Sequence, residues 1–235
     1  MTALPVVTIF GNSDSGKTGL VEELIKDFSE DGLEVCTVKH SPADISLDEE
    51  GKDTWRHKKA GSRLTAFSTE TETSFLVPRK MELEEIVEKI GKIIDPDLVI
   101  AEGYKDADVP KVAVGEIEPR DNTLHRYEGD IDELKREIRD LIEVSRLENE
   151  LPGLDCARCG YENCNELARA IYEGEKELSD CEVREQRTVD LKVNGEDVPL
   201  EHFPAQFVEG GLKGMLRALK GVDEDINEIS LKIRD

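Results

Sequence analysis

The chain has 235 residues, of which 37% are hydrophobic and 36% are charged, as in a globular protein with a densely charged surface. Its 54 acidic residues against 31 basic ones give a formal net charge of −23, and only 5% of the residues are aromatic. This balance argues against binding to nucleic acid or to anionic membranes. Because we find neither a signal peptide nor a membrane-spanning run, we expect a cytoplasmic protein with reduced cysteines.

The first part of the chain alternates apolar runs with helical patterns, which predicts an α/β domain with a mainly parallel, helix-covered sheet. Apolar runs of strand length cover residues 5–10, 33–38, 63–69, 73–79, 97–103 and 110–117. Apolar residues at helical spacing mark residues 17–29, 81–94 and 129–147. We therefore expect a first domain over residues 1–148.

Two smaller parts are expected to follow. Residues 149–185 hold four of the five cysteines and predict a small helical domain around a metal centre. Residues 186–235 predict an α+β tail. Its elements are a hairpin over 188–200 with an Asn-Gly turn, a helix over 203–221 and a strand over 225–235.

A phosphate-binding loop follows the first predicted strand. The segment fits the pattern G-x-x-x-x-G-K-S/T between a strand and a helix, which is the structural context that the motif requires. Backbone amides of the loop and of the helix start would bind phosphate, Lys17 would reach the β- and γ-phosphates, and Thr18 would bind Mg²⁺. The motif comprises Gly11, Asn12, Ser13, Asp14, Ser15, Gly16, Lys17 and Thr18.

An acidic residue at a neighbouring strand end would complete the magnesium site. The run DLVIAEG offers Asp97 at its start and Glu102 at its carboxyl end. Ligands gather at the carboxyl ends of strands in parallel sheets, so we predict Glu102. No N-K-x-D motif is present, and the residues alone do not decide between GTP and ATP.

A basic, glycine-bracketed stretch covers residues 51–61. It can form a lip over phosphates or an anionic substrate, or it can be a solvated helix start that Asp53 or Thr54 caps. His40 follows the second predicted strand and leaves the same choice between a site residue and a structural one. Among its basic residues, Arg56, His57, Lys58 and Lys59 stand out in an acidic protein.

Three stretches together resemble a known family. They read TIFGNSDSGKTGLVEELI, VCTVKHSPADISLDEEGKDTWRHKKAGS and DLVIAEGYKDADVPKVAV, and they lie within residues 5–145. The chain resembles the MobB family of molybdopterin-guanine dinucleotide biosynthesis proteins B. The resemblance implies a GTP-binding, dimeric P-loop protein with weak GTPase activity. Its implied partner is a MobA-type nucleotidyltransferase, which attaches the guanosine monophosphate to molybdopterin.

The resemblance also assigns residues. It implies that the loop at 11–18 binds nucleotide, that Thr18 and Glu102 serve Mg²⁺, and that Asp53 and Arg56 line the nucleotide site. A further aspartate of the family pattern corresponds to Asp44 or Asp48. Residues 188–233 resemble the C-terminal extension of archaeal members.

The cysteines form a second motif, in which three lie within nine residues and the fourth follows beyond a predicted helix. Four thiolates can close a zinc site or hold a 4Fe–4S cluster, whereas a disulfide is disfavoured in a reducing compartment. The uneven spacing favours the cubane but leaves zinc open. The four are Cys156, Cys159, Cys164 and Cys181.

Residues 152–183 resemble the small four-cysteine iron–sulfur domain of electron-transfer and corrinoid proteins. The shared pattern is C-x-x-C-G, a later cysteine, then A-x-A-I, G-E and the last cysteine. This resemblance implies a 4Fe–4S cluster. Cys36 lies inside a predicted strand and is expected to be a buried, inert thiol.

Three functions are compatible with these motifs. The chain can be a GTP-binding accessory factor for molybdenum or tungsten cofactor maturation, with a molybdo- or tungstoenzyme as a further partner. It can instead be an electron-transfer or nucleotide-driven reductase component, or a module that delivers cofactor and uses hydrolysis as a switch. The MobB-like residues favour the first function. The reductase would need a second redox site, and the cysteines supply only one.

Overall fold

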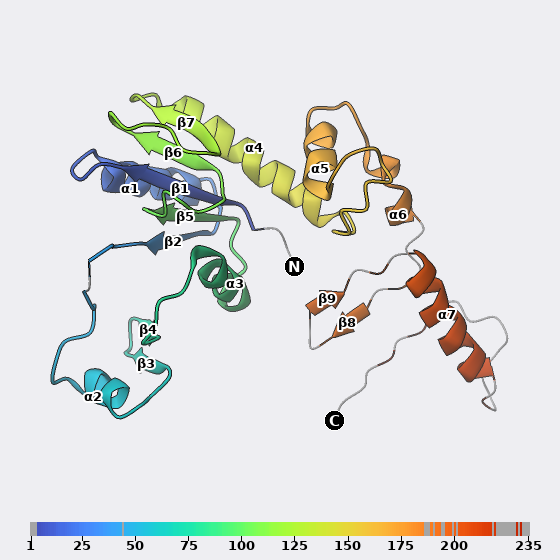
Figure 1. Ribbon diagram of the computed structural model, residues 1–235, viewed down its shortest axis with the longest axis horizontal. Helices are drawn as coiled ribbons and strands as arrows, with labels where there is room; N and C mark the ends of the chain where they lie inside the picture. Colours follow the sequence, from blue (N-terminus) through green and yellow to red (C-terminus); the bar gives the residue numbers. More distant parts are fainter. Residues whose placement is uncertain are drawn as a thin grey trace. The chain divides into compact units, whose positions relative to one another are not determined.

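Five parallel strands form the central sheet in the computed structural model of the chain (Figure 1). Their order is β2-β5-β1-β6-β7, so β1 lies in the middle and is hydrogen-bonded on both sides. The predicted parallel α/β sheet is confirmed. The strands are β1 (Val6–Gly11), β2 (Val35–Lys39), β5 (Leu98–Glu102), β6 (Lys111–Val114) and β7 (Thr123–Tyr127).

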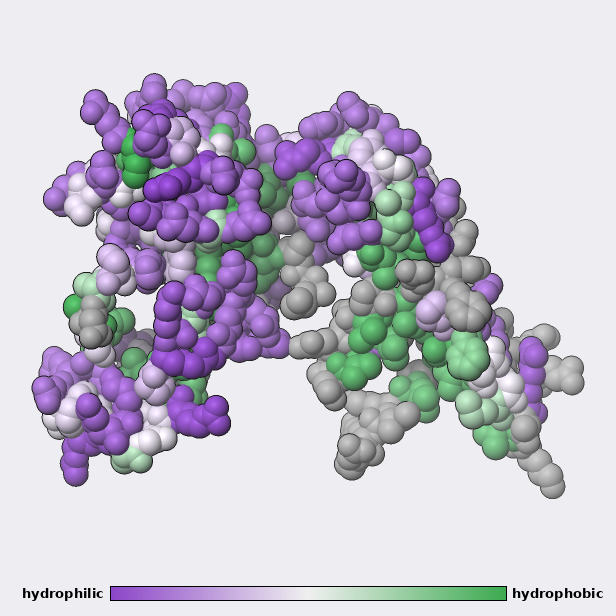
Figure 2. Space-filling view, viewed as in Figure 1, coloured by the Kyte–Doolittle hydropathy of each residue, from purple (hydrophilic) through white to green (hydrophobic). Residues whose placement is uncertain are grey.

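The structure describes residues 4–43, 45–185, 189, 191–193, 196–198, 200, 202–217, 219, 229 and 231. The chain folds as two units, Leu4–Arg139 and the residues from Asp140 onward. On the face seen in Figure 2, the surface of the first unit is largely hydrophilic, as the purple colour shows. Within the described residues, no helix combines the length and the apolar character that crossing a membrane requires.

The central sheet owes its core to helices that bury one apolar face. Helix α1 (Lys17–Glu30) buries Leu20, Val21, Leu24 and Phe28. Burial of a side chain such as Leu24 or Phe28 contributes roughly 1.5–3 kcal/mol. Helix α3 (Leu83–Ile93) places Leu83 in a cluster with Val6, Val38, Val99 and Ala101.

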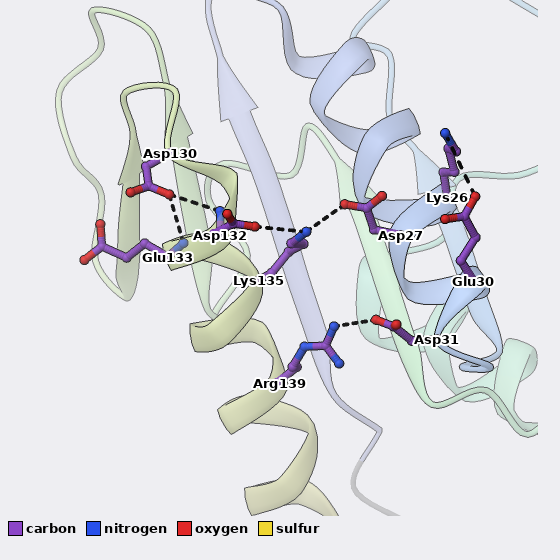
Figure 3. A network of polar contacts seen from close by, with 9 residues as sticks. All are labelled: Lys26, Asp27, Glu30, Asp31, Asp130, Asp132, Glu133, Lys135 and Arg139. Atoms are coloured by element: carbon purple, nitrogen blue, oxygen red, sulfur yellow. Dashed lines mark hydrogen bonds and ion pairs between the residues drawn. The ribbon is translucent and has the colours of Figure 1, made fainter.

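Helix α4 (Ile131–Asn149) is held against α1 by polar contacts (Figure 3). Lys135 Nζ lies 2.9 Å from Asp27 Oδ2, and the Arg139 guanidinium pairs with Asp31. Asp130 Oδ1 accepts hydrogen bonds from two backbone amides of the first turn of α4, each at 3.1 Å. This contact caps the amino end of α4. The two ion pairs fix α4 beside the helix that carries the phosphate-binding motif.

The remaining elements of the first unit form a separate substructure. A short helix, α2 (Asp53–Lys59), is followed by β3 (Thr65–Ser68) and β4 (Thr73–Leu76). These two strands pair antiparallel with each other and do not join the central sheet.

The structure also differs from the expected pattern at the far edge of the sheet. Strand β7 was not predicted, because its sequence TLHRY contains two basic residues and half-buried positions. The connections from β5 to β6 and from β6 to β7 contain no helix. The predicted alternation of strands and helices therefore does not extend past β5 to β6 and β7.

The second unit contains the cysteine-rich domain and the tail. Its described elements are α5 (Cys164–Tyr172), the 3-10 helix η1 (Leu178–Asp180), α6 (Glu182–Glu185), β8 (Leu191–Val193), β9 (Glu196–Val198) and α7 (His202–Arg217). Antiparallel pairing of β8 with β9 confirms the predicted hairpin, and α7 confirms the predicted tail helix. The Asn-Gly turn and most of the predicted strand at 225–235 lie outside the described residues. Helix α7 leaves Phe207 and Met215 exposed.

Candidate functional site

The phosphate-binding motif forms the turn between β1 and α1. A Cβ atom at Gly11 would lie 2.4 Å from the backbone oxygen of Val114, so the turn requires glycine there. Asp14 and Gly16 adopt left-handed conformations, with φ of 59° and 90°. No side chain caps the amino end of α1, so the first-turn amides can face an anion. The loop thus has the shape and polarity of a phosphate cradle.

A cleft of about 1250 Å³ lies along this turn. It is lined by the loop, by the carboxyl ends of β2 and β5, by the start of α3 and by the segment after β5. Its volume exceeds the ~300–1,000 Å³ of typical ligand sites. Every motif residue except Asn12 lines it, and Asn12 instead donates a hydrogen bond from Nδ2 to the carbonyl of Glu116 at 3.2 Å.

Thr18, Glu102 and Lys39 line the cleft, and Glu102 contacts the other two. The Thr18 hydroxyl lies 3.3 Å from both carboxylate oxygens of Glu102. The Lys39 ammonium pairs with Glu102 Oε1, although Lys39 was not selected from the sequence. A hydroxyl and a carboxylate are hard oxygen ligands, which Mg²⁺ prefers, so these two residues fit the predicted magnesium site.

Lys17 and Ser15 are two further polar groups of the loop. Lys17 donates a hydrogen bond from Nζ to the carbonyl of Asn12. The Ser15 hydroxyl is buried and has no hydrogen-bond partner among the described residues. Both groups lie where the motif predicts phosphate contacts.

Asp97 and His40 were also proposed from the strand ends, and only one of them lines the cleft. Asp97 lies at the start of β5, where its Oδ2 accepts the Glu34 amide at 2.9 Å, and it does not line the cleft. His40 does line the cleft, and its ring packs against that of Tyr104 at 4.8 Å between centroids. Glu102 is therefore the strand acid at the cleft.

The structure does not bring Asp53 and Arg56 to the cleft. Both are exposed on α2, where Arg56 Nη1 lies 3.6 Å from Asp53 Oδ1. Neither they nor any other residue of 51–61 lines the cleft as described. In this structure the stretch is a solvated helix, and its role in nucleotide binding stays a prediction.

Asp48 also belongs to the α2 substructure. It accepts a hydrogen bond from Thr54 Oγ1 at 2.7 Å, and Lys58 Nζ lies 3.0 Å away. The hydrogen bond from Thr54, with a smaller effect of Lys58, holds the pKa of Asp48 below its usual value, although burial opposes this. Asp48 therefore anchors α2, and Asp44 lies outside the described residues.

The four predicted cluster cysteines line one small cavity in the second unit. Cys164 and Cys181 are buried, and Cys156 and Cys159 are half-buried against the same apolar cluster, which contains Leu167. No three Cys, His, Asp or Glu side chains in the described part of the chain converge closely enough to hold a metal ion. The thiols share a cavity without meeting at one point.

Backbone amides surround the Cys164 sulfur. Burial has the largest effect and leaves the pKa of the thiol raised, although backbone hydrogen bonds from Asp155, Gly153 and Leu154 oppose it. Amides that point at sulfur are one means by which proteins tune iron–sulfur centres. Four thiols around one apolar-walled cavity therefore fit a cluster with four cysteine ligands.

The loop around Cys156 has an unusual backbone. Asp155 and Ala157 both adopt left-handed conformations, with φ of 46° and 56°. A non-glycine residue in this region costs roughly 1–2 kcal/mol. The Asp155 carboxylate secures the loop by accepting the Cys164 amide at 2.7 Å. Apart from the nearby glycines, no pattern in the sequence indicates this arrangement.

The fifth cysteine lines neither the cleft nor the cysteine cavity. Cys36 is half-buried on β2 and packs against the cluster that contains Leu83. Burial, and to a smaller extent the charge of Glu34, raises the pKa of its thiol. A protonated thiol is a poor nucleophile, in agreement with the expected inert role.

Comparison with known proteins adds independent information. Residues 6–131 match the family described as "MobB: Molybdopterin guanine dinucleotide synthesis protein B", and residues 151–183 match the one described as "Putative Fe-S cluster". The crystal structure of Bacillus subtilis MobB is 24% identical, with a TM-score of 0.43, and the match covers 54% of this chain and 86% of that one.

Two curated relatives show how far the similarity extends. A "Putative molybdopterin-guanine dinucleotide biosynthesis adapter protein" of Methanocaldococcus jannaschii is 30% identical over 232 residues, covering 93% of each chain. An adapter protein of Haemophilus influenzae is 33% identical over 111 residues, covering 46% of this chain and 62% of the relative. With a family match over more than half its length and a relative aligned over nearly all of it, the chain belongs to the MobB family.

Proposed function

We propose that the chain is a GTP-binding adapter in the biosynthesis of molybdopterin guanine dinucleotide for molybdenum or tungsten enzymes. The observation that carries the proposal is the cleft, in which the phosphate-binding loop meets the Thr18–Glu102 pair. The names of the relatives supply the pathway and the term adapter. We place the protein in the cytoplasm, as a homodimer that assists a MobA-type nucleotidyltransferase.

Different residues of the cleft contact different parts of a bound triphosphate. Amides at the start of α1 bind phosphate oxygens, and Lys17 exchanges the Asn12 carbonyl for phosphate. Thr18 and Glu102 hold Mg²⁺, which supplies positive charge to the phosphates when bound. No arginine lines the described cleft. Hydrolysis of GTP is therefore slow without a partner.

We further propose that Cys156, Cys159, Cys164 and Cys181 hold a 4Fe–4S cluster. The shared cavity and the match of residues 151–183 support this assignment. When bound, the cluster supplies an electron centre or a structural cross-link. The four residues themselves bind iron as thiolates, and the burial of Cys164 and Cys181 limits access of water and oxygen.

Calorimetric titration tests the nucleotide site directly. Wild-type protein should bind GTP more tightly than ATP in the presence of Mg²⁺, and Lys17→Ala should lower the affinity by at least about tenfold because a charge-assisted phosphate contact is lost. Lys26→Ala is the matched control, since Lys26 lies exposed on the same helix. Unchanged affinity in Lys17→Ala would exclude this loop as the nucleotide site.

A further inference from the structure

Lys39 is the charged partner of the predicted magnesium carboxylate. It is the last residue of β2 and lies directly opposite Glu102 in the register with β5. Its ammonium contacts Glu102 Oε1. The Glu102 side chain is only 10% exposed, whereas that of Lys39 is 62% exposed. An exposed cation thus compensates a buried anion.

The backbone holds Glu102 in place without help from this ion pair. Its carbonyl accepts the His40 amide at 2.9 Å, and the following Gly103 amide donates to the Ile9 carbonyl at 2.9 Å. Strands on both sides of β5 fix its course. The Thr18 hydroxyl is a neutral partner of the carboxylate, and Lys39 supplies the positive charge beside it. A buried carboxylate without a charged partner is costly.

Three other lysines line the cleft, namely Lys17, Lys80 and Lys105, and the first two have partners of their own. Lys17 donates to the Asn12 carbonyl, and Lys80 Nζ lies 2.6 Å from Glu82 Oε1. The Lys39 ammonium therefore stands on the same carboxylate that would receive a metal ion. A divalent cation bound there would repel the Lys39 ammonium at close range and neutralise the carboxylate charge that attracts it.

We propose that Lys39 is a switching cation, which pairs with Glu102 in the empty site and with the terminal phosphate of a bound nucleoside triphosphate. This inference rests on the proposed function and assigns a residue that distinguishes GTP from GDP. The long, exposed side chain can change partners without any movement of β2. The switch exchanges one ion pair for another, so no charge is left buried and unpaired when the site fills.

Titration of Lys39→Met with GTP and with GDP at several magnesium concentrations tests the switch. We expect the ratio of the GTP affinity to the GDP affinity to fall about tenfold, because one charge-assisted hydrogen bond to the terminal phosphate is lost. Loss of the competing cation should also lower the magnesium concentration needed for half-maximal binding. Lys39→Arg should restore most of the preference for GTP.

Magnesium alone gives a readout that is independent of nucleotide. In thermal unfolding without nucleotide, Lys39→Met should have a lower Tm than wild type and should be rescued by less Mg²⁺. Lys26→Met, which removes the same charge from an exposed site on α1, should change neither measurement. If Lys39→Met does not fold, Lys39→Gln provides the same comparison with a polar side chain.

The outcomes separate this inference from the proposed function. Failure of wild-type protein to bind GTP would contradict the proposed function itself. Binding of GTP by wild type, with an unchanged GTP-to-GDP ratio in Lys39→Met, would overturn only the switch. A higher magnesium requirement in Lys39→Met would also overturn it, because Lys39 would then serve to hold Glu102 in position.

Discussion

Gly11 illustrates how one residue determines the phosphate-binding turn. Its Cα faces the backbone of β6, and no side chain can be accommodated because the Val114 carbonyl belongs to a hydrogen-bonded strand. Glycine at this position is thus required by close packing, and the turn keeps its φ within the ordinary range. The constraint comes from β6, which is about 100 residues away in sequence.

We predict that Gly11→Ala lowers the free energy of unfolding by roughly 1–3 kcal/mol, the range for overpacked sites. Gly19→Ala on α1 is the matched control, because a Cβ atom there would meet no described residue outside its own helix within 4 Å. That change should stabilise the helix by about 0.5–1 kcal/mol. Denaturant unfolding of both variants measures the difference, and a similar loss in both would show that the Val114 contact is unimportant.

A partly buried ion pair between Lys135 and Asp27 positions helix α4 against helix α1. The Lys135 side chain is 21% exposed at its contact with Asp27, whereas Lys26 is 71% exposed at its contact with Glu30. Exposed ion pairs contribute little because water screens them. Hydrogen bonds to Asp27, and then to Asp132, raise the pKa of Lys135.

Lys135→Met should therefore lower the Tm by roughly 2 °C at neutral pH, and Lys26→Met should have almost no effect. Because the folded pKa of Lys135 is raised, its contribution is full below the ordinary lysine pKa and disappears as the pH rises through the folded value. Thermal unfolding across the alkaline range measures both effects. Equal shifts in the two variants would contradict this role for the Lys135–Asp27 pair.

Elements with a strong local pattern could be predicted from the sequence. Strands β1 and β5 are continuous buried apolar runs, and α1 and α4 have apolar residues at helical spacing. Strand β7 was missed because an edge strand with exposed positions needs no apolar run. The placement of α2 could not be predicted either, since it depends on the path of the chain between β2 and β5.

The same distinction applies to the site. Loop 11–18 and Glu102 follow from a motif and from the rule that ligands gather at carboxyl strand ends. Lys39 carries no such signal, because its importance depends on the strand register that places it opposite Glu102. Asp53 and Arg56 were assigned by resemblance, and the structure leaves them outside the described cleft.

At the scale of the whole molecule, the chain combines a MobB unit with a four-cysteine unit. The family matches cover separate ranges, 6–131 and 151–183, and the relative from Methanocaldococcus jannaschii aligns across both. The chain therefore carries a candidate nucleotide site and a candidate cluster site on one polypeptide. The two can be tested separately, since they share no residue.

Metal analysis of anaerobically purified protein tests the cluster site. We expect about four irons per chain, and Cys164→Ser should lose most of the iron and lower the Tm because ligand binding contributes to folding of this unit. Cys36→Ser is the control and should retain the iron, because Cys36 lies on β2. One zinc per chain would contradict the iron–sulfur assignment.

The central claim is that GTP binding in the cleft supports dinucleotide formation. The most direct measurement is the rate at which a MobA-type nucleotidyltransferase joins molybdopterin and GTP, with and without this chain. We predict that wild-type protein raises the rate and that Lys17→Ala does not, while Lys26→Ala behaves as wild type. Equal stimulation by wild type and Lys17→Ala would contradict this claim.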